Sequence, residues 1–213
     1  MLNERNSRNN YNFTQTFKTP LVIDLAFKNN KKPKVGNVLI SDPFLDEDYF
    51  RRSVVLLCDH NSEGSFGFVL NNYLEIDLHE VDESFPDIKA RISVGGPVET
   101  QSLFFIHSFG DEVEGGIPIN DELSFGGDYE QIQALLDADK SLASKIRFFL
   151  GYSGWGEKQL KGELKENAWI VADNISTDEI LSTSDDQFWN HCLEKQGERF
   201  KTISKFPINP QDN

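Results

Sequence analysis

The chain has 213 residues, and its 35 acidic against 21 basic residues give a formal net charge of −14. This length suits one domain that buries a sizeable core without disulfides or metals. The charge argues against a general nucleic-acid binder, because non-specific affinity for phosphate backbones comes from Lys and Arg. No stretch approaches the ~20 apolar residues of a membrane helix, so we expect a cytoplasmic protein with no membrane contact.

The amino-terminal part differs from the rest of the chain. We predict a partly flexible arm and linker over residues 1–34 and a single domain over residues 35–213. The first 19 residues are polar and Asn-rich and lack the apolar centre of a signal peptide. Phe13 and Phe17 lie four residues apart, a spacing that would suit a short helix laid on a surface. The lysines between residues 28 and 34 predict an exposed linker.

Apolar and alternating runs predict strands over most of the domain. Residues 53–58 form the continuous apolar run of a buried strand, and in residues 64–71 Phe66, Phe68 and Leu70 share one face. Turn residues between these two runs predict a hairpin. Further strands are expected at 38–40, 91–94, 103–108, 118–119, 123–125, 146–150 and 169–172, with 91–94 and 103–108 paired across the Gly95-Gly96-Pro97 turn.

Helices are expected mainly in the carboxyl-terminal third. Capping-box patterns begin at Asp128, Ser176 and Ser184. Residues 157–167 also read as helical, and the helix after Ser184 is expected to carry one apolar face and to stop at Gly197. Long runs of strands followed by clustered helices indicate an α+β fold.

Metal, redox and cofactor chemistry find little support. Cys58 and Cys192 are far apart and belong to no CxxC pair, so two buried thiols are expected. His60 and His107 each end a predicted strand and could meet near Asp59 in a metal site, but isolated histidines are the commoner case. We therefore expect no metal and no cofactor.

Residues 151–155, Gly-Tyr-Ser-Gly-Trp, allow three interpretations. After a strand and before a helix, they resemble the nucleophile elbow G-x-S-x-G, except that Trp155 stands where the last glycine belongs. Free backbone N–H groups at such a turn could instead hold an anion. We favour a structural strand-to-helix corner with Trp155 packed in the core, because glycine turns are mostly structural.

Several segments together resemble the AlgH/YqgE family of bacterial proteins. The resemblance rests on motifs that follow one another over roughly residues 35–173, namely G-x-V-L-I-S-D-P-F at 36–44, F-R-R-S-V-V-L-L at 50–57, G-S-F-G-F-V-L-N at 64–71, G-G-P-V-E at 95–99, residues 103–108, residues 151–160 and Ala168-Trp169. It implies an α+β fold in which mainly antiparallel strands form a distorted, barrel-like sheet flanked by helices. The family often carries the label of transcriptional regulator and brings no agreed catalytic residues. No helix-turn-helix is legible here, so we do not carry that label over as a mechanism.

The leading hypothesis is a non-catalytic binding or adaptor protein, with an indirect regulatory role, whose partner is an unknown protein or small ligand. Glycine turns, aromatics and amides outside any catalytic pattern suit a recognition surface. The candidate surface consists of Asn71, Gly95, Gly96, Pro97, Tyr152, Gly154, Trp155, Gln159 and Glu163. The alternative is an enzyme that uses the Tyr152-Ser153 corner with His60 or His107. Direct DNA regulation is a distant third hypothesis.

Overall fold

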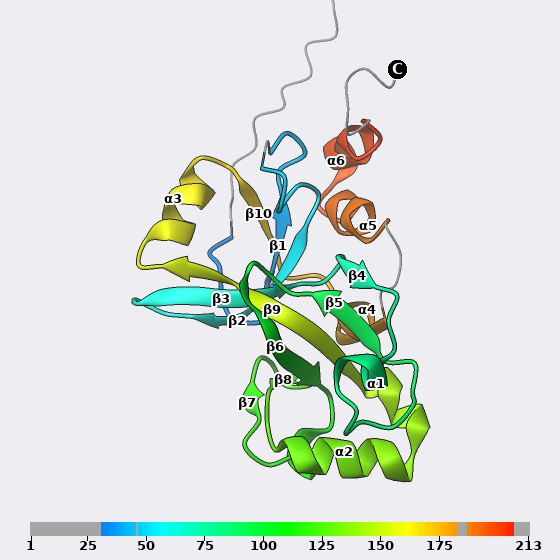
Figure 1. Ribbon diagram of the computed structural model, residues 1–213. Helices are drawn as coiled ribbons and strands as arrows, with labels where there is room; N and C mark the ends of the chain where they lie inside the picture. Colours follow the sequence, from blue (N-terminus) through cyan, green and yellow to red (C-terminus); the bar gives the residue numbers. More distant parts are fainter. Residues whose placement is uncertain (1–30, 46, 183–186, 207–213) are drawn as a thin grey trace, which may run out of the picture.

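The computed structural model describes residues 31–45, 47–182 and 187–206 (Figure 1). Most of the predicted arm, and the capping box expected at Ser184, lie outside these residues. In the part that is described, Lys31, Lys32 and Lys34 are exposed, as expected for the linker. No described helix combines the length and the apolar character needed to cross a bilayer.

The described strands form one ten-stranded sheet in the order β10-β1-β2-β3-β9-β6-β8-β7, to which β5 joins beside β9 and β4 beside β5. Every pairing is antiparallel except that of β5 with β9. The outermost strands of this path, β10 and β7, do not pair with each other within the described chain, so the sheet is open. The predicted α+β fold of mainly antiparallel strands flanked by helices is confirmed, and the sheet does not close into a barrel within the described chain. The strands are β1 (Val38–Ser41), β2 (Val54–His60), β3 (Gly64–Val69), β4 (Tyr73–Leu74), β5 (Arg91–Val94), β6 (Val98–His107), β7 (Ile117–Pro118), β8 (Ser124–Phe125), β9 (Ile146–Gly156) and β10 (Trp169–Ala172).

The long strand β9 joins the two halves of the sheet and crosses the centre of the molecule (Figure 1). Its first half lies between β5 and β6, and its second half pairs with β3. The predicted pairing of 91–94 with 103–108 is therefore wrong, because β9 separates them. The turn between them is no hairpin: Gly95 donates its N–H to the Leu150 carbonyl of β9 (2.8 Å) and accepts from the Val69 N–H at the end of β3 (2.9 Å).

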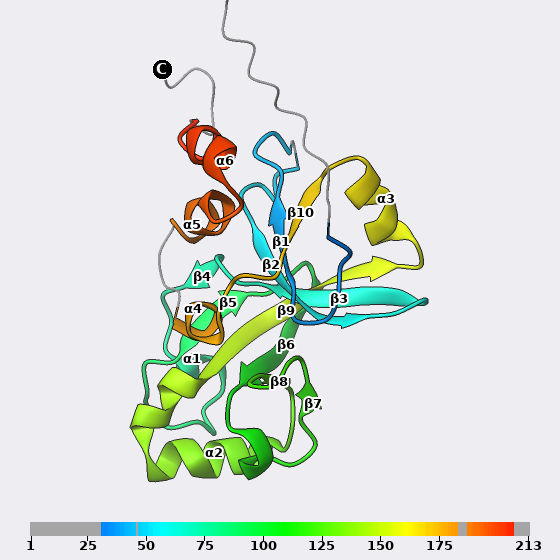
Figure 2. The same cartoon turned by 180° about the vertical axis from the view of Figure 1, so that it is seen from behind.

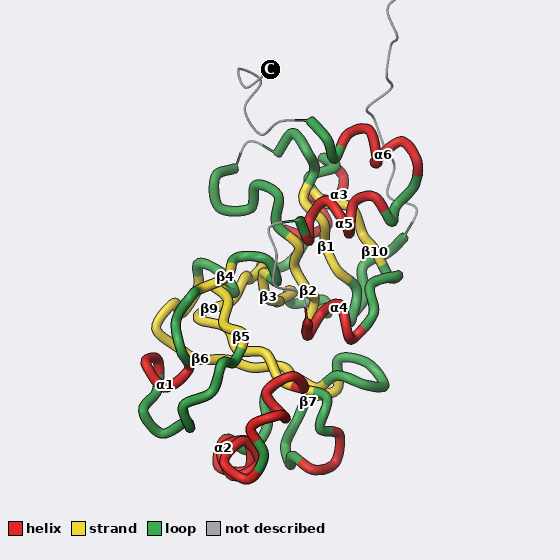
Figure 3. Tube along the Cα trace, turned by 90° about the vertical axis from the view of Figure 1, so that its right-hand side faces the viewer, coloured by secondary structure: helices red, strands yellow, loops and turns green. Residues whose placement is uncertain are grey.

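Helices cover both faces of the sheet and sit at opposite ends of the molecule, with α2 at one end and α5 and α6 at the other in all three views (Figures 1, 2 and 3). They are α1 (Leu78–Val81), α2 (Tyr129–Ala138), α3 (Gln159–Lys165), α4 (Thr177–Ser182), α5 (Phe188–Glu194) and α6 (Glu198–Ile203), with 3-10 turns at Gly110–Glu112 and Lys140–Lys145. As predicted, the Asp128 carboxylate caps α2 by accepting from the Gln131 N–H (3.0 Å).

Alternation along β1 and β2 sends side chains into two separate cores. Ile40 and Leu56 face a core completed by α4, α5 and α6. Leu39 and Leu57 face the opposite core, which α3 covers. A third cluster packs the second half of the sheet against α1 and α2. The predicted hairpin of β2 and β3 is confirmed, with Phe66 and Phe68 on the first of these faces.

The least expected core residue is Arg147 on β9, which is fully buried. Its guanidinium donates to the Ile180 carbonyl (2.7 Å), to Ser93 Oγ (2.9 Å) and to the Leu70 carbonyl. Burial lowers the pKa of Arg147 to about 10, so the group stays charged at neutral pH. Arg147 thereby ties α4, β5 and the end of β3 to the start of β9.

Acid is expected to weaken the contact between α4 and α5 through Glu179. Burial raises the pKa of Glu179, but hydrogen bonds from Lys195, Ser176 and His191 outweigh it and hold the pKa far below the ordinary 4.5. Because the native pKa of Glu179 is depressed, its ionised form stabilises the fold above pH 4.5, and this stability is lost as the pH falls below that value. Urea unfolding of wild type and Glu179→Gln at pH 7 and about pH 3.5 should show the larger acid loss in wild type. Equal losses would contradict the assignment.

An aromatic groove as candidate functional site

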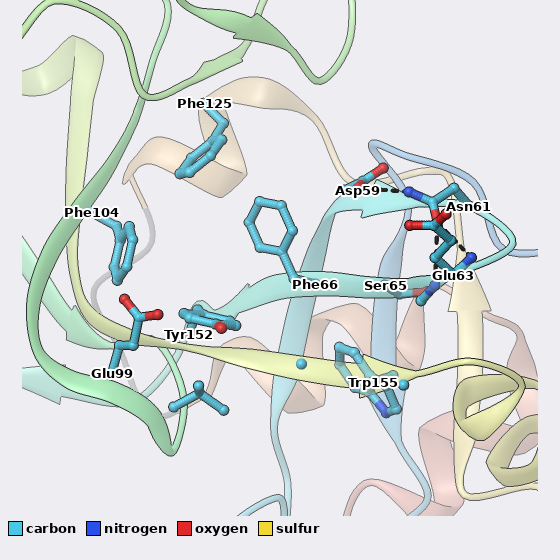
Figure 4. Close-up of a pocket in the computed structure, with 14 residues that line it drawn as sticks. Asp59, Asn61, Glu63, Ser65, Phe66, Glu99, Phe104, Phe125, Tyr152 and Trp155 are labelled. Carbon is cyan, nitrogen blue, oxygen red and sulfur yellow. Dashed lines mark hydrogen bonds between the residues drawn. The ribbon is translucent and has the colours of Figure 1, made fainter.

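Four half-buried aromatic rings line a broad cavity of about 670 Å³ beside the β2–β3 hairpin (Figure 4). We call this cavity the aromatic groove. Its rings belong to Phe66 of β3, Phe104 of β6, Phe125 of β8 and Tyr152 of β9, and all four are half-buried. They pack on the core beneath them and leave part of each ring open to solvent.

The strand register explains why the rings gather. Phe66 pairs with Gly154, which has no side chain, so its ring meets that of Tyr152 two residues away on the same face, with centroids 5.9 Å apart. Phe104 lies edge-on to Tyr152 (5.7 Å), and Phe125 lies edge-on to Phe66 (5.1 Å). Edge-to-face contacts of this kind hold aromatic side chains in place. The groove therefore has a preformed floor.

A bulge in β6 forms one rim of the groove. Val98 pairs with Tyr152 but Leu103 pairs with Leu150, so β6 carries extra residues between these two positions. Such bulges re-aim side chains. Glu99 takes a positive φ of 50° in the bulge, and its carboxylate points toward Phe104 and Tyr152 in Figure 4. Pro97 and Val98 are exposed at the same rim.

Of the nine predicted surface residues, Tyr152, Gly154 and Trp155 line the groove. Trp155 does so only marginally, since its indole is 5% exposed and packs in the core under α3. Gly95 and Gly96 are buried where the turn before β6 crosses β9.

The amides and the carboxylate among the predicted residues serve the fold. Asn71 accepts from the Val54 N–H (2.8 Å) and donates to the Arg52 carbonyl (2.8 Å). Gln159 accepts from the Gly156 N–H (3.1 Å) and donates to Glu163 Oε1 (2.9 Å). These bonds fix the start of β2 and the corner between β9 and α3.

Glu163 joins two buried tryptophans, because its Oε2 accepts from the indoles of Trp155 (2.8 Å) and Trp169 (2.7 Å). Replacing Glu163 by alanine leaves both indole N–H groups without this partner. We expect Glu163→Ala to lower the free energy of unfolding by about 2 kcal/mol. Urea denaturation should measure this loss, with the exposed Glu166→Ala as the control that changes it by less than about 0.5 kcal/mol. An equally small effect of both substitutions would show that the hydrogen bonds from Glu163 to the two tryptophans do not stabilise the fold.

The expected strand-to-helix corner at residues 151–155 is wrong, because these residues belong to β9, which continues to Gly156. The physical reason is that β3 supplies a partner strand for residues 153–156, and Gly151 bends the strand at a positive φ of 69° without ending it. Ser153 is fully buried and its hydroxyl donates to the Gly95 carbonyl (3.1 Å). The segment is therefore no nucleophile elbow.

The histidines do not converge on Ser153 or on one another. His60 lies near the carboxyl-terminal end of β9, because it pairs with Ser65, which pairs with Trp155. His107 pairs with Ile146 at the opposite end of β9. His107 is buried, donates from Nε2 to the Gly126 carbonyl (2.9 Å) and accepts at Nδ1 from a backbone N–H. Burial lowers its pKa, which keeps the imidazole neutral.

No cluster of three potential metal-ligating side chains occurs among residues 31–45, 47–182 and 187–206. The two thiols are buried and free, as predicted for Cys58 and Cys192. Burial raises the pKa of Cys192 to about 12, so it stays a thiol at neutral pH.

Sequence reasoning missed most of the groove. The alternation places Phe66 on one face of its strand with Phe68 and Leu70, but no local pattern shows that Phe104 and Phe125 meet it. Asp59, Glu63 and Glu99 also line the groove, and only the register of four strands brings them to one surface.

Comparisons with known proteins identify relatives over most of the chain. A family model described as AlgH-like matches residues 38–201. A UPF0301 protein of Parabacteroides distasonis is 41% identical over 187 residues, which cover 87% of this chain and 94% of that protein. Another, from Cytophaga hutchinsonii, is 38% identical over 179 residues, covering 84% of this chain and 98% of that protein.

Two solved structures share the fold. A crystal structure of a Corynebacterium diphtheriae protein has a TM-score of 0.68 at 21% identity, covering 86% of this chain and 97% of that one. The solution structure of the AlgH protein from Pseudomonas aeruginosa has a TM-score of 0.64 at 24% identity, covering 83% and 98%. With the family match spanning residues 38–201 and relatives at about 40% identity over nearly their whole length, this chain belongs to the AlgH-like family.

Proposed function

We propose that this chain is a non-catalytic binding or adaptor protein of the bacterial cytoplasm, and that it recognises its partner through the aromatic groove. The observation that carries the proposal is a preformed, half-exposed aromatic surface. The nearby Ser153 is buried, and its hydroxyl is hydrogen-bonded within the fold. Aromatic residues are enriched in recognition surfaces because they offer large contact areas at low entropic cost.

Other functions find less support. An enzyme that uses Ser153 would need a hydroxyl open to a substrate and a base within reach. Ser153 is fully buried and donates its hydroxyl to the Gly95 carbonyl. Both ring nitrogens of His107 are hydrogen-bonded to backbone, and His60 Nδ1 is hydrogen-bonded to Ser65 Oγ. Direct DNA binding is disfavoured by the net charge of −14. A regulatory role would then be indirect, through the bound partner.

Site-specific photocrosslinking tests the proposal. A photoreactive benzoyl-phenylalanine replaces Val98, 37% exposed at the groove rim, or Phe44, 53% exposed after β1 and outside the groove lining, as the matched control. We expect a discrete crosslinked partner from position 98 in living cells and none from position 44. The identified partner is then purified, and its affinity is measured for wild type and for Gly154→Gln.

The glutamine at position 154 would project into the groove, where only the Tyr152 ring lies close to the added Cβ. We expect it to weaken binding at least about tenfold, the effect of losing one good contact. Gly162→Ala on α3, where an added Cβ meets nothing within 4 Å, should bind like wild type. Equal crosslinking from both positions, or full affinity of Gly154→Gln, would contradict the proposal.

A further inference from the structure

Among the described residues, every charged side chain that lines the aromatic groove is negative. Three carboxylates line it, from Asp59 at the end of β2, Glu63 in the β2–β3 turn and Glu99 in the β6 bulge. No described Lys, Arg or His does. A cavity lined by one sign of charge beside apolar walls focuses its field and favours ligands of the opposite sign.

These carboxylates occupy two separate ends of the groove, with the rings between them (Figure 4). Glu99 follows Val98, which pairs with Tyr152 of β9, and β9 pairs with β3 through Gly154 and Phe66. Phe66 in turn pairs with Asp59 of β2. Glu99 and Asp59 are thus separated by three gaps between strands, about 14 Å across the sheet at ~4.8 Å per gap, and also by the offset along β9 from Tyr152 to Gly154.

The carboxylates are available for a partner. Asp59 accepts a hydrogen bond from Asn61 (3.0 Å), a neutral group of the same turn. Neither Glu63 nor Glu99 forms an ion pair with a described residue, and both are exposed. Glu99 holds a positive φ, a conformation that non-glycine residues adopt at a cost and that is found at functional sites.

We propose that the aromatic groove binds an extended, lysine-bearing peptide segment of a partner protein, in which an aromatic or large apolar residue stands between two basic ones. This inference rests on the proposed function and names its partner class. The central side chain would lie on the four rings, and the lysines would reach Glu99 at one end and Asp59 and Glu63 at the other. Extended chain advances ~3.4 Å per residue, so the ~14 Å across the sheet corresponds to basic residues four positions apart, and the long lysine stems would cover the offset along β9.

The chemistry selects this occupant over others. Aromatic faces attract ammonium groups, and lysine stems can lie along apolar surface while their charges reach the rim. A nucleic acid would bring phosphates against three carboxylates. A second copy of this chain would bring a net charge of −14 against another. A small cation could reach only one of the two acidic ends at a time.

Binding of short synthetic peptides to the full chain tests the inference. The probe is a dye-labelled, end-blocked peptide of sequence Gly-Ser-Lys-Gly-Phe-Gly-Lys-Ser-Gly, and its fluorescence anisotropy is measured. Matched controls replace both lysines by glutamate, or the phenylalanine by serine. We expect each control to bind at least about tenfold more weakly, and the affinity of the probe to fall as sodium chloride rises from about 50 to about 300 mM.

Two protein variants locate the site. Asp59→Asn with Glu63→Gln and Glu99→Gln removes the groove charges, whereas Glu83→Gln with Glu130→Gln and Asp137→Asn removes as many exposed charges elsewhere. We expect the first variant to weaken binding of the probe about tenfold and the second to weaken it less than about twofold. Because both variants remove three negative charges, the difference reports the groove and not the net charge. Tyr152→Leu should also weaken the probe, because it removes a ring but keeps an apolar side chain.

The inference is overturned if the lysine and glutamate peptides bind alike, if both triple variants behave alike, or if the probe does not bind at all. It is also overturned if self-association of the chain displaces the probe, since a second copy would then occupy the groove. These outcomes differ from failure of the proposed function. Suppose that a crosslinked partner binds Gly154→Gln more weakly than wild type but binds the triple variant of Asp59, Glu63 and Glu99 as tightly as wild type. That result would support the adaptor role and contradict the basic peptide.

Discussion

Replacing Arg147 by methionine is expected to lower the free energy of unfolding by about 3 kcal/mol. Methionine fills most of the space of the arginine stem but donates no hydrogen bond. The carbonyls of Leu70 and Ile180 and the hydroxyl of Ser93 would lose this donor inside the core.

The two opposing effects can be compared. A buried acceptor left without a partner costs about 1–3 kcal/mol, and three acceptors are affected. Removing the charge relieves a desolvation penalty, which is evident in the lowered pKa of Arg147. We expect the lost hydrogen bonds to outweigh this relief, since the guanidinium also lies over the rings of Tyr73 (5.2 Å) and Phe149 (5.5 Å).

Urea unfolding measures the loss, with Lys145→Met as the matched control at an exposed position two residues earlier. The control should change stability by less than about 0.5 kcal/mol. A double-mutant cycle with Ser93→Ala should give a coupling of about 1 kcal/mol, because these side chains bond directly. A change in Arg147→Met as small as that of the control would show that the buried arginine does not hold these strands together.

Arg147 also marks a limit of sequence reasoning. Its strand was predicted, but an arginine between isoleucine and phenylalanine reads as a solvent-facing position in a half-buried strand. The acceptors that satisfy its charge come from the end of β3, from β5 and from α4, all distant in sequence. No local pattern could bring those three together.

Local patterns succeeded where neighbouring residues decide the structure. The continuous apolar run of β2 and the alternation of β3 fixed a hairpin because its turn lies between them. The capping carboxylate of Asp128 and the apolar face of α5 also depend on residues within two turns.

Local patterns failed where a distant strand decides. Residues 151–155 look like a corner until β3 extends β9, and the Gly95-Gly96-Pro97 turn looks like a hairpin until β9 inserts between its flanking strands. The groove has the same origin. Tyr152 and Gly154 were selected from a motif, but Phe104, Phe125 and Glu99 reach them only through the assembled sheet.

Gly96 is the second position where a single substitution should have a large effect, and it tests the crossing that builds the groove rim. A Cβ added at Gly96 would overlap the carbonyl carbon and oxygen of Tyr152 and the amide nitrogen of Ser153. These are backbone atoms of the central strand, so they cannot move aside as a side chain would. The turn before β6 would have to lift off β9 at this crossing, where Gly95 is hydrogen-bonded to β9 and β3.

We therefore expect Gly96→Ala to lower the free energy of unfolding by at least about 3 kcal/mol, near the upper end of overpacking effects. The matched control is Gly162→Ala on α3, whose Cβ would meet nothing within 4 Å. This control should raise stability by about 0.5–1 kcal/mol, because alanine loses less backbone entropy than glycine in a helix. Thermal and urea unfolding of both variants decide the matter. If Gly96→Ala is as stable as wild type, the turn does not press on β9, and the groove rim is built in some other way.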